Sequence, residues 1–283
     1  PSKDANLNPA YIVVDYETES DYAQSWTYGG RGAAKLLDDK VEVGASYISE
    51  GGARDTLQGL DATIDFTKRT RLQLEYATSR AANGPDRDAY LAELRHNSSD
   101  VEGALYYRKR ESGFGLGHQS PIGSGTGIYG FDGRYHATDR LDVVTGAFRQ
   151  TDIETGAVRD VAEASAVYDT SGKGGSIGLR TARDRYADGT RDRSDQVTLG
   201  AHQAFLDHRL NLRINREQSL SENANPDYPT RTLLGADYLL NPTTTLFLEQ
   251  ELTAGDTQET RGTRIGMTNR PWTGASVNTS LEQ

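Results

Sequence analysis

The sequence RLNLRIN at residues 209–215 alternates polar and apolar side chains at every step. In an extended chain, Leu210, Leu212 and Ile214 share one face, and the arginines and asparagines share the other. Successive side chains of a β-strand point to opposite faces of the sheet. This period of two therefore predicts a strand with one apolar face and one charged face.

The same alternation recurs along the chain from Tyr11 onward, whereas helical periodicity is absent almost everywhere. The alternating segments include Ile12 to Tyr16 and residues 41–47, 60–66, 71–76, 129–135, 197–201, 234–240 and 246–252. We therefore expect an all-β protein with about 17 strands, whose boundaries are less certain than their number.

Composition restricts the kind of protein further. Only 35% of the residues are hydrophobic and the mean hydropathy is −0.69, yet the chain has 15 Tyr and 30 Gly. No segment approaches the roughly 20 apolar residues that a membrane helix needs, so any membrane crossing must be made by strands. Acidic and basic residues are mixed and the net charge is −10, which argues against nucleic-acid binding. The chain has no Cys and begins at Pro1 without a charged and apolar leader.

The connections between the expected strands differ along the chain. Short turns are predicted near Asp38-Asp39, Lys68-Arg69, Ser98-Ser99, Thr138-Asp139, Ser171-Gly172, Asp207-His208, Asn241-Pro242 and Arg270-Pro271. Longer polar connections are expected between them, at residues 111–124, 184–194 and 218–227. Tight turns at one end and longer loops at the other are typical of outer-membrane barrels.

A membrane barrel explains the alternation better than a soluble sandwich does. Lipid would cover the apolar face, water would fill the lumen beside the charged face, and closure would remove unpaired edges. We therefore predict one domain over residues 1–283, a transmembrane antiparallel up-and-down β-barrel in the bacterial outer membrane. Aromatic residues near the strand ends are candidates for interfacial girdles: Tyr47, Tyr76, Tyr107, Tyr135, Tyr168, Tyr238, Trp26 and Trp272.

The number of strands suggests a longer intact protein. Bacterial single-chain barrels normally have an even number of strands, so about 17 predicts that at least one is missing and that the intact protein has about 18 or more. The chain also ends in Ser280-Leu281-Glu282-Gln283, without a terminal aromatic residue. We expect the chain to be a fragment of a longer one.

Residues 196–283 also carry a resemblance to a known class of proteins. The segments are QVTLGAHQAFLDHRLNLRINREQSL, PTRTLLGADYLLNPTTTLFLEQELTAGD and TRIGMTNRPWTGASVNTSLEQ, and LNPAYIVVDYETES near the start fits the same pattern. They resemble the barrel region of large Gram-negative cell-surface proteins, whose barrel is similar to that of TonB-dependent receptors. The resemblance implies a role in the cell envelope and transfers no site residues.

Three other kinds of site are weaker interpretations. The glycines of GFGLG and GSGTG lack the helix that a phosphate cradle needs, so we interpret them as a loop or strand-end kinks. The carboxylates Asp184, Asp188, Asp192 and Asp195 lie among arginines and depart from EF-hand spacing, so a solvated loop is favoured over a Ca²⁺ site. His136 would face the lumen near Asp132, but no nucleophile elbow is present. We expect no enzyme activity, no cofactor and no metal.

The charged faces of the strands are the candidate functional site. A ring of charges would set the field that a solute crosses in a pore. For any single residue, however, the favoured interpretation is that it only hydrates the wall and pairs across strands. Alternation predicts these lumen-facing residues: Arg31, Glu42, Asp61, Arg71, Glu75, Glu93, Arg95, Arg108, Asp132, Arg134, Arg180, Arg209, Arg213, Asp237, Glu249 and Glu251.

Two functions remain open from the sequence. One is a water-filled channel for transport or export across the outer membrane. The other is a non-conducting barrel that anchors surface or periplasmic modules, or scaffolds an envelope complex. The expected partners are outer-membrane lipid, lipopolysaccharide, and a periplasmic or surface protein.

Overall fold

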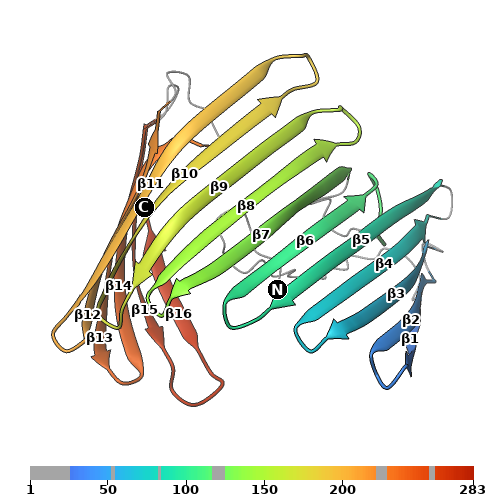
Figure 1. Ribbon diagram of the computed structural model, residues 1–283, viewed down its shortest axis with the longest axis horizontal. Coiled ribbons are helices and arrows are strands. Elements are labelled where there is room, and N and C mark those ends of the chain that lie inside the picture. The colour runs from blue at the N-terminus through green and yellow to red at the C-terminus, as the bar shows by residue number, and fades with distance from the viewer. Residues whose placement is uncertain (1–25, 52–54, 82–83, 117–124, 221–227, 255–258) are drawn as a thin grey trace.

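The computed structural model describes residues 26–51, 55–81, 84–116, 125–220, 228–254 and 259–283 (Figure 1). Every regular element in these ranges is a strand, and no helix there is long and apolar enough to span a bilayer. The strands are β1 (Thr27–Leu36), β2 (Val41–Glu50), β3 (Asp55–Thr67), β4 (Thr70–Arg80), β5 (Asp86–Asn97), β6 (Val101–Arg110), β7 (Thr126–Thr138), β8 (Leu141–Asp152), β9 (Val158–Asp169), β10 (Lys173–Arg185), β11 (Arg191–Phe205), β12 (Leu210–Ser219), β13 (Thr230–Asn241), β14 (Thr244–Ala254), β15 (Glu259–Asn269) and β16 (Val277–Glu282).

The strands form a single 16-stranded sheet in which each strand pairs with its neighbour in the sequence. Every pairing is antiparallel, for example β10 with β9 on one side and with β11 on the other. The sheet is long and strongly curved (Figure 1). Within the described ranges, β1 and β16 each pair on one side only. The predicted all-β, up-and-down outer-membrane barrel fold is confirmed, and the strand expected at Ile12 to Tyr16 lies outside the described residues.

Short turns connect the strands at one end of the sheet, which we call the turn end. All eight turns predicted from the sequence lie there, in the connections that follow the odd-numbered strands. Two of them are built from consecutive residues with positive φ: Leu37, Asp38 and Asp39 after β1, and Leu206, Asp207 and His208 after β11. The left-handed conformation is unusual for residues other than glycine, and Asp and His tolerate it better than Leu does.

The opposite end of the sheet, which we call the loop end, differs from the prediction. Longer connections occur there at residues 111–125 and 220–229. The connection predicted at 184–194 is wrong, because β10 continues to Arg185 and β11 begins at Arg191. Cross-strand hydrogen bonding extends this hairpin, and a tight turn closes it at Asp188. Asp188 accepts hydrogen bonds from the backbone N–H (2.9 Å) and hydroxyl (2.6 Å) of Thr190, which lower its pKa.

One face of the sheet, the apolar face, carries the exposed large hydrophobic side chains of the strands. We define it as the side of the sheet to which Leu212 points. The strand registers place Leu234 of β13 and Leu248 of β14 on the same side. Leu60 is 61% exposed and Leu179 is 63% exposed, which is unfavourable in water and natural against lipid. The alternate side chains form the opposite face, the polar face. Among the large hydrophobics exposed within the described strands, Leu239 lies on the polar face.

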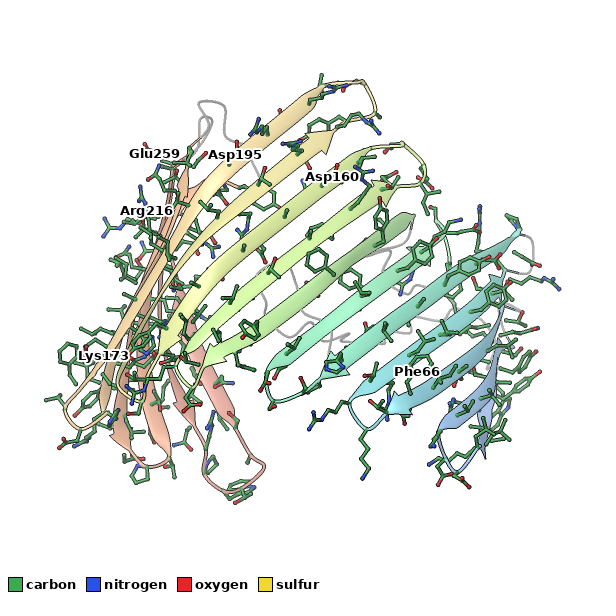
Figure 2. All side chains as sticks on the ribbon, in the orientation of Figure 1. Phe66, Asp160, Lys173, Asp195, Arg216 and Glu259 are labelled. Atoms are coloured by element: carbon green, nitrogen blue, oxygen red, sulfur yellow. The ribbon has the colours of Figure 1, made fainter. Side chains whose placement is uncertain are left out.

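Aromatic residues border the apolar face at both ends of the strands. At the loop end they include Tyr28, Tyr47, Tyr76, Tyr90, Tyr107 and Tyr129, on strands β1 to β7. At the turn end they include Tyr135, Tyr168, Phe205 and Tyr238, on strands β7 to β13. Tyrosine suits a membrane interface, because its ring prefers hydrocarbon and its hydroxyl prefers water. Figure 2 shows the apolar face, with Phe66 and Lys173 toward the turn end and Asp160 and Asp195 toward the loop end.

Candidate functional site

The charged residues predicted for the lumen lie, with one exception, on the polar face. The strand registers place each of them on the side of the sheet opposite to its apolar neighbours in the strand. For example, Leu212 and its partner Ala236 lie on the apolar face, whereas Arg213 and its partner Gly235 lie on the polar face. The residues on this face are Arg31, Glu42, Asp61, Arg71, Glu75, Glu93, Arg95, Arg108, Asp132, Arg134, Arg180, Arg213, Asp237, Glu249 and Glu251.

Arg209 is the exception, and its predicted position is wrong. It belongs to the turn between β11 and β12, because β12 begins only at Leu210 after three residues with positive φ. Its guanidinium lies 5.5 Å from the ring centre of Tyr238, which is on the apolar face, and it donates to the carbonyl of Leu240 at 3.0 Å. Arg209 therefore ties the turn to the neighbouring strand.

Three strands are bridged by a single arginine at the start of the sheet. Arg31 of β1 reaches across β2 to donate two hydrogen bonds to Asp61 of β3, at 3.1 and 2.5 Å. It also contacts Glu42 of β2 at 3.0 Å. The path lies over Gly44, where a Cβ would approach a terminal nitrogen of Arg31 and the Asp61 carboxylate to 2.7 Å. Glycine at this position therefore leaves the space that the bridge occupies.

A second cluster joins β5 and β6. Glu93 forms ion pairs with Arg95 on its own strand and, at 2.9 Å, with Arg108 on β6. The Glu93 side chain is only 12% exposed, so these two guanidinium groups compensate a carboxylate that has lost much of its water. Farther along the face, the imidazole of His136 lies 2.8 Å from Asp142, rather than beside Asp132 as expected.

The longest network follows the polar face from β9 to β14. Glu163 pairs with Arg180 at 3.0 Å, and Arg180 reaches Glu217 of β12 at 3.5 Å. Glu217 lies 3.7 Å from Arg231 of β13, which in turn lies 3.8 Å from Glu251 of β14. Opposite charges therefore alternate along a line that crosses the strands, and each arginine is held between two carboxylates.

Arg213 forms a second bridge over a glycine. It pairs with Asp237 of β13, and its other terminal nitrogen reaches Glu249 of β14 at 2.5 Å. Glu249 also lies 3.6 Å from Arg264 of β15. A Cβ at Gly235, in the middle of this path, would overlap the Arg213 guanidinium. At two distant places in the sheet, Gly44 and Gly235, the missing side chain of a glycine thus leaves room for an arginine to reach across the strand.

A tyrosine from the connection between β12 and β13 packs on the polar face, which the sequence did not predict. Tyr228 is 9% exposed and packs with Val161 and Ala182. Its ring centre lies 5.8 Å from the guanidinium of Arg159 and 5.9 Å from that of Arg180. A lone aromatic residue beside a proline in an otherwise polar loop was the available signal.

Two polar side chains of β11 hold the backbone of this connection. Gln196 is 1% exposed and donates from its amide nitrogen to the carbonyls of Tyr228, at 2.8 Å, and Pro229, at 3.1 Å. Ser194 donates to the Tyr228 carbonyl at 3.4 Å. Polar side chains this deeply buried are costly unless they are hydrogen-bonded, so these contacts fix the segment against the wall.

The connection between β6 and β7 also begins by folding over the polar face. The backbone N–H of Gly115 donates to the hydroxyl of Ser79 at 3.0 Å, and Ser79 is 2% exposed. Leu116 is 3% exposed, and the guanidinium of Arg110 lies 6.0 Å from the ring centre of Phe114. Segments from two loop-end connections therefore lie on the charged face.

The polar face is hollowed between β5 and β9. The hollow has a volume of about 470 Å³, and its walls include Glu93, Tyr106, Arg108, Asp132 and Phe148. Within the described part of the chain, no group of three or more His, Asp or Glu side chains could hold a metal ion. Asp184 instead pairs with Arg159 at 2.8 Å on the polar face, and Asp195 lies on the apolar face beside Arg193, at the same distance.

By its sheet topology and its exposed apolar face, the chain is a bacterial outer-membrane β-barrel protein. No protein-family model matches the sequence, and no curated protein matches it. Solved structures of the same class do resemble it.

Three of these solved structures have a TM-score above 0.5. OccK10 (OpdN) of Pseudomonas aeruginosa has a TM-score of 0.53 at 12% identity, over 90% of this chain and 89% of that one. OccAB2 of Acinetobacter baumannii has a TM-score of 0.52 at 12% identity, over 92% and 86%. The siderophore receptor PirA of Pseudomonas aeruginosa has a TM-score of 0.51 at 13% identity, and the match covers 90% of this chain and 61% of the receptor. At these identities the likeness shows the fold.

Proposed function

We propose that this protein forms a water-filled channel that carries small hydrophilic solutes across the outer membrane. The observation that carries the proposal is the charged polar face, which runs along the sheet opposite the apolar face. A transmembrane barrel with this number of strands encloses a lumen wider than side chains alone can fill. Arginine and carboxylate side chains cover this wall, which is suited to contact with water rather than with a packed core.

The ion-pair networks give the wall a defined electrostatic pattern. Each bridging arginine is held by carboxylates on different strands, as Arg180 is held by Glu163 and Glu217. Fixed charges of both signs at close range can orient a polar or charged solute while it passes. The segment at Tyr228 adds an aromatic surface among these charges, which narrows the space above β9 to β11.

Conductance in a planar lipid bilayer tests the proposal. The full chain, folded into vesicles and fused with the bilayer, should produce discrete and lasting current steps in potassium chloride. Folding is checked first by the heat-dependent shift in electrophoretic mobility that membrane barrels show. A folded and inserted protein that passes no current would contradict the channel.

Silence in that experiment would favour the other function that the fold permits. The resemblance of residues 196–283 to TonB-dependent receptor barrels implies a barrel that anchors surface or periplasmic modules. Crosslinking in intact cells, followed by identification of a stable envelope partner, would then test the anchor.

A further inference from the structure

Four arginines form a compact basic patch on the apolar face of β10 and β11, at the loop end. In the hairpin register, Arg183 lies directly opposite Arg193, and Arg185 lies directly opposite Arg191. All four are exposed. Like charges placed directly opposite one another destabilise a pair of strands. Two such pairs in succession therefore concentrate positive charge at this part of the apolar face.

The carboxylates near this arginine patch neutralise it only in part. Asp195 pairs with Arg193 at 2.8 Å and also accepts a hydrogen bond from Thr181 at 2.8 Å. Asp160, on β9, lies directly opposite Arg183 in the register, but its two oxygens also accept hydrogen bonds from Arg149 at 2.5 and 2.8 Å. Arg149 and the four patch arginines therefore share two carboxylates, and an excess of positive charge remains. Among the described residues, ion pairs of the patch arginines are confined to Arg193.

The arginine patch lies just beyond the lipid-facing band of the same two strands. Leu179 lies opposite Val197 and Ile177 lies opposite Leu199, and these side chains are exposed on the apolar face. A strand rises about 3.4 Å per residue and is tilted by about 45°, so the step from Leu179 to Arg183 climbs roughly 10 Å along the membrane normal. From the outer edge of the hydrocarbon, a step of that size reaches the lipid headgroups.

The arginine patch also interrupts the aromatic girdle. At the loop end, strands β2 to β7 carry tyrosines on the apolar face, such as Tyr47, Tyr90 and Tyr129. Followed through the strand register from Tyr129, the same row of side chains carries charged residues instead and reaches Arg183 on β10 and Arg193 on β11. This part of the interface therefore favours contact with anions. The tyrosines elsewhere favour contact with the boundary between hydrocarbon and water without carrying charge.

We propose that the arginine patch binds the phosphate groups of lipid A, the membrane anchor of lipopolysaccharide. Longer connections mark the loop end as the cell-surface end, so the arginines face the leaflet that contains this lipid. Guanidinium groups bind phosphate oxygens in bidentate geometry. The apolar residues directly below the patch lie where the acyl chains of the same molecule would run. The site therefore fits a phosphorylated glycolipid better than a free anion.

Binding of purified lipid A to the full chain in detergent micelles tests the site, with native mass spectrometry as the readout. The variant Arg183→Gln/Arg185→Gln/Arg191→Gln/Arg193→Gln should bind diphosphorylated lipid A at least about tenfold more weakly, because it loses all four charge-assisted contacts. The matched control is Arg80→Gln. Arg80 lies on the same face at the same end, far along the sheet from the patch, and Asp86 already compensates it. The control should bind as the unaltered chain does.

Three further probes separate the sources of phosphate. Lipid A stripped of its phosphates should bind the unaltered chain and the quadruple variant equally weakly. Inorganic phosphate and phosphatidylglycerol vesicles should compete poorly with lipid A. Unchanged lipid A binding by the folded quadruple variant would overturn the proposal, as would equal competition by either phosphate probe. Ion conductance should be the same in all these variants, so the outcome is independent of whether the barrel conducts.

Discussion

At the scale of single residues, two arginines depend on glycines that lie beneath them. In the variant Gly235→Val, the new side chain would occupy the place of the Arg213 guanidinium and separate it from Asp237 and Glu249. We expect the free energy of unfolding to fall by about 1–3 kcal/mol, because the valine overpacks the site and because the charged groups lose their ion-pair partners. Urea unfolding in lipid vesicles measures it.

The control for that variant is Gly262→Val on β15, which lies two strands along the sheet from β13. It changes the same residue type in the same sheet, but a Cβ at Gly262 would meet no atom within 4 Å. Valine is favoured over glycine in strands, so this variant should keep or slightly raise the stability. Equal losses in the two variants would show that the space above Gly235 is unimportant.

Arg180 offers a second test at this scale, on the proposed channel. The variant Arg180→Gln leaves Glu163 and Glu217 without the cation between them, so the wall becomes more negative. We expect the ratio of cation to anion permeability to rise by roughly twofold or more, measured as the reversal potential in a salt gradient. The control is Arg149→Gln, which removes the same charge from the apolar face. In this variant the ratio of cation to anion permeability should stay unchanged.

At the scale of elements, the turn after β11 holds three residues in the left-handed conformation. Asp207 has a φ of 53° within this turn. Glycine adopts that conformation without steric cost, so Asp207→Gly should raise the free energy of unfolding by roughly 0.5–1 kcal/mol. Asp139, in the turn after β7, does not have a positive φ, so Asp139→Gly should not raise the free energy of unfolding. A gain of the same size at both turns would contradict this explanation.

Local patterns in the sequence predicted the strands and turns well, because strand alternation and turn residues act over short distances. The faces of Arg213 and Glu249 followed from counting in twos along a single strand. Arg209 was misplaced because three left-handed residues delay the start of β12 by a residue. The end of β10 was also misplaced, because charged residues in a cross-strand ladder look like a solvated loop when each strand is considered alone.

The contacts of the loop-end segments could not be predicted in this way. Tyr228 is held by Gln196 and by the ring contact with Arg180, which lie far from it in the sequence. Such contacts depend on how the whole sheet curves. The ion-pair networks across several strands could not be predicted either. Alternation predicts the face on which a charged side chain lies, but not which other charge on that face it pairs with.

At the scale of the whole molecule, the two ends of the sheet should lie on opposite sides of the membrane. The chain has no Cys, so one introduced Cys is a unique label. A membrane-impermeant maleimide added to intact cells should label Asp188→Cys at the loop end and leave Asp139→Cys at the turn end unlabelled. Both positions should react after the cells are lysed. The reverse pattern would mean that the orientation is wrong and that the arginine patch faces the inner leaflet.

The arginine bridges over Gly44 and Gly235 also constrain how this sequence can evolve. A side chain gained at residue 235 is harmful while arginine occupies residue 213, and harmless once that arginine has gone. Substitutions at the two positions must therefore occur in a particular order. Among descendants of this sequence, a bulky residue at 235 should be inherited together with a shorter residue at 213.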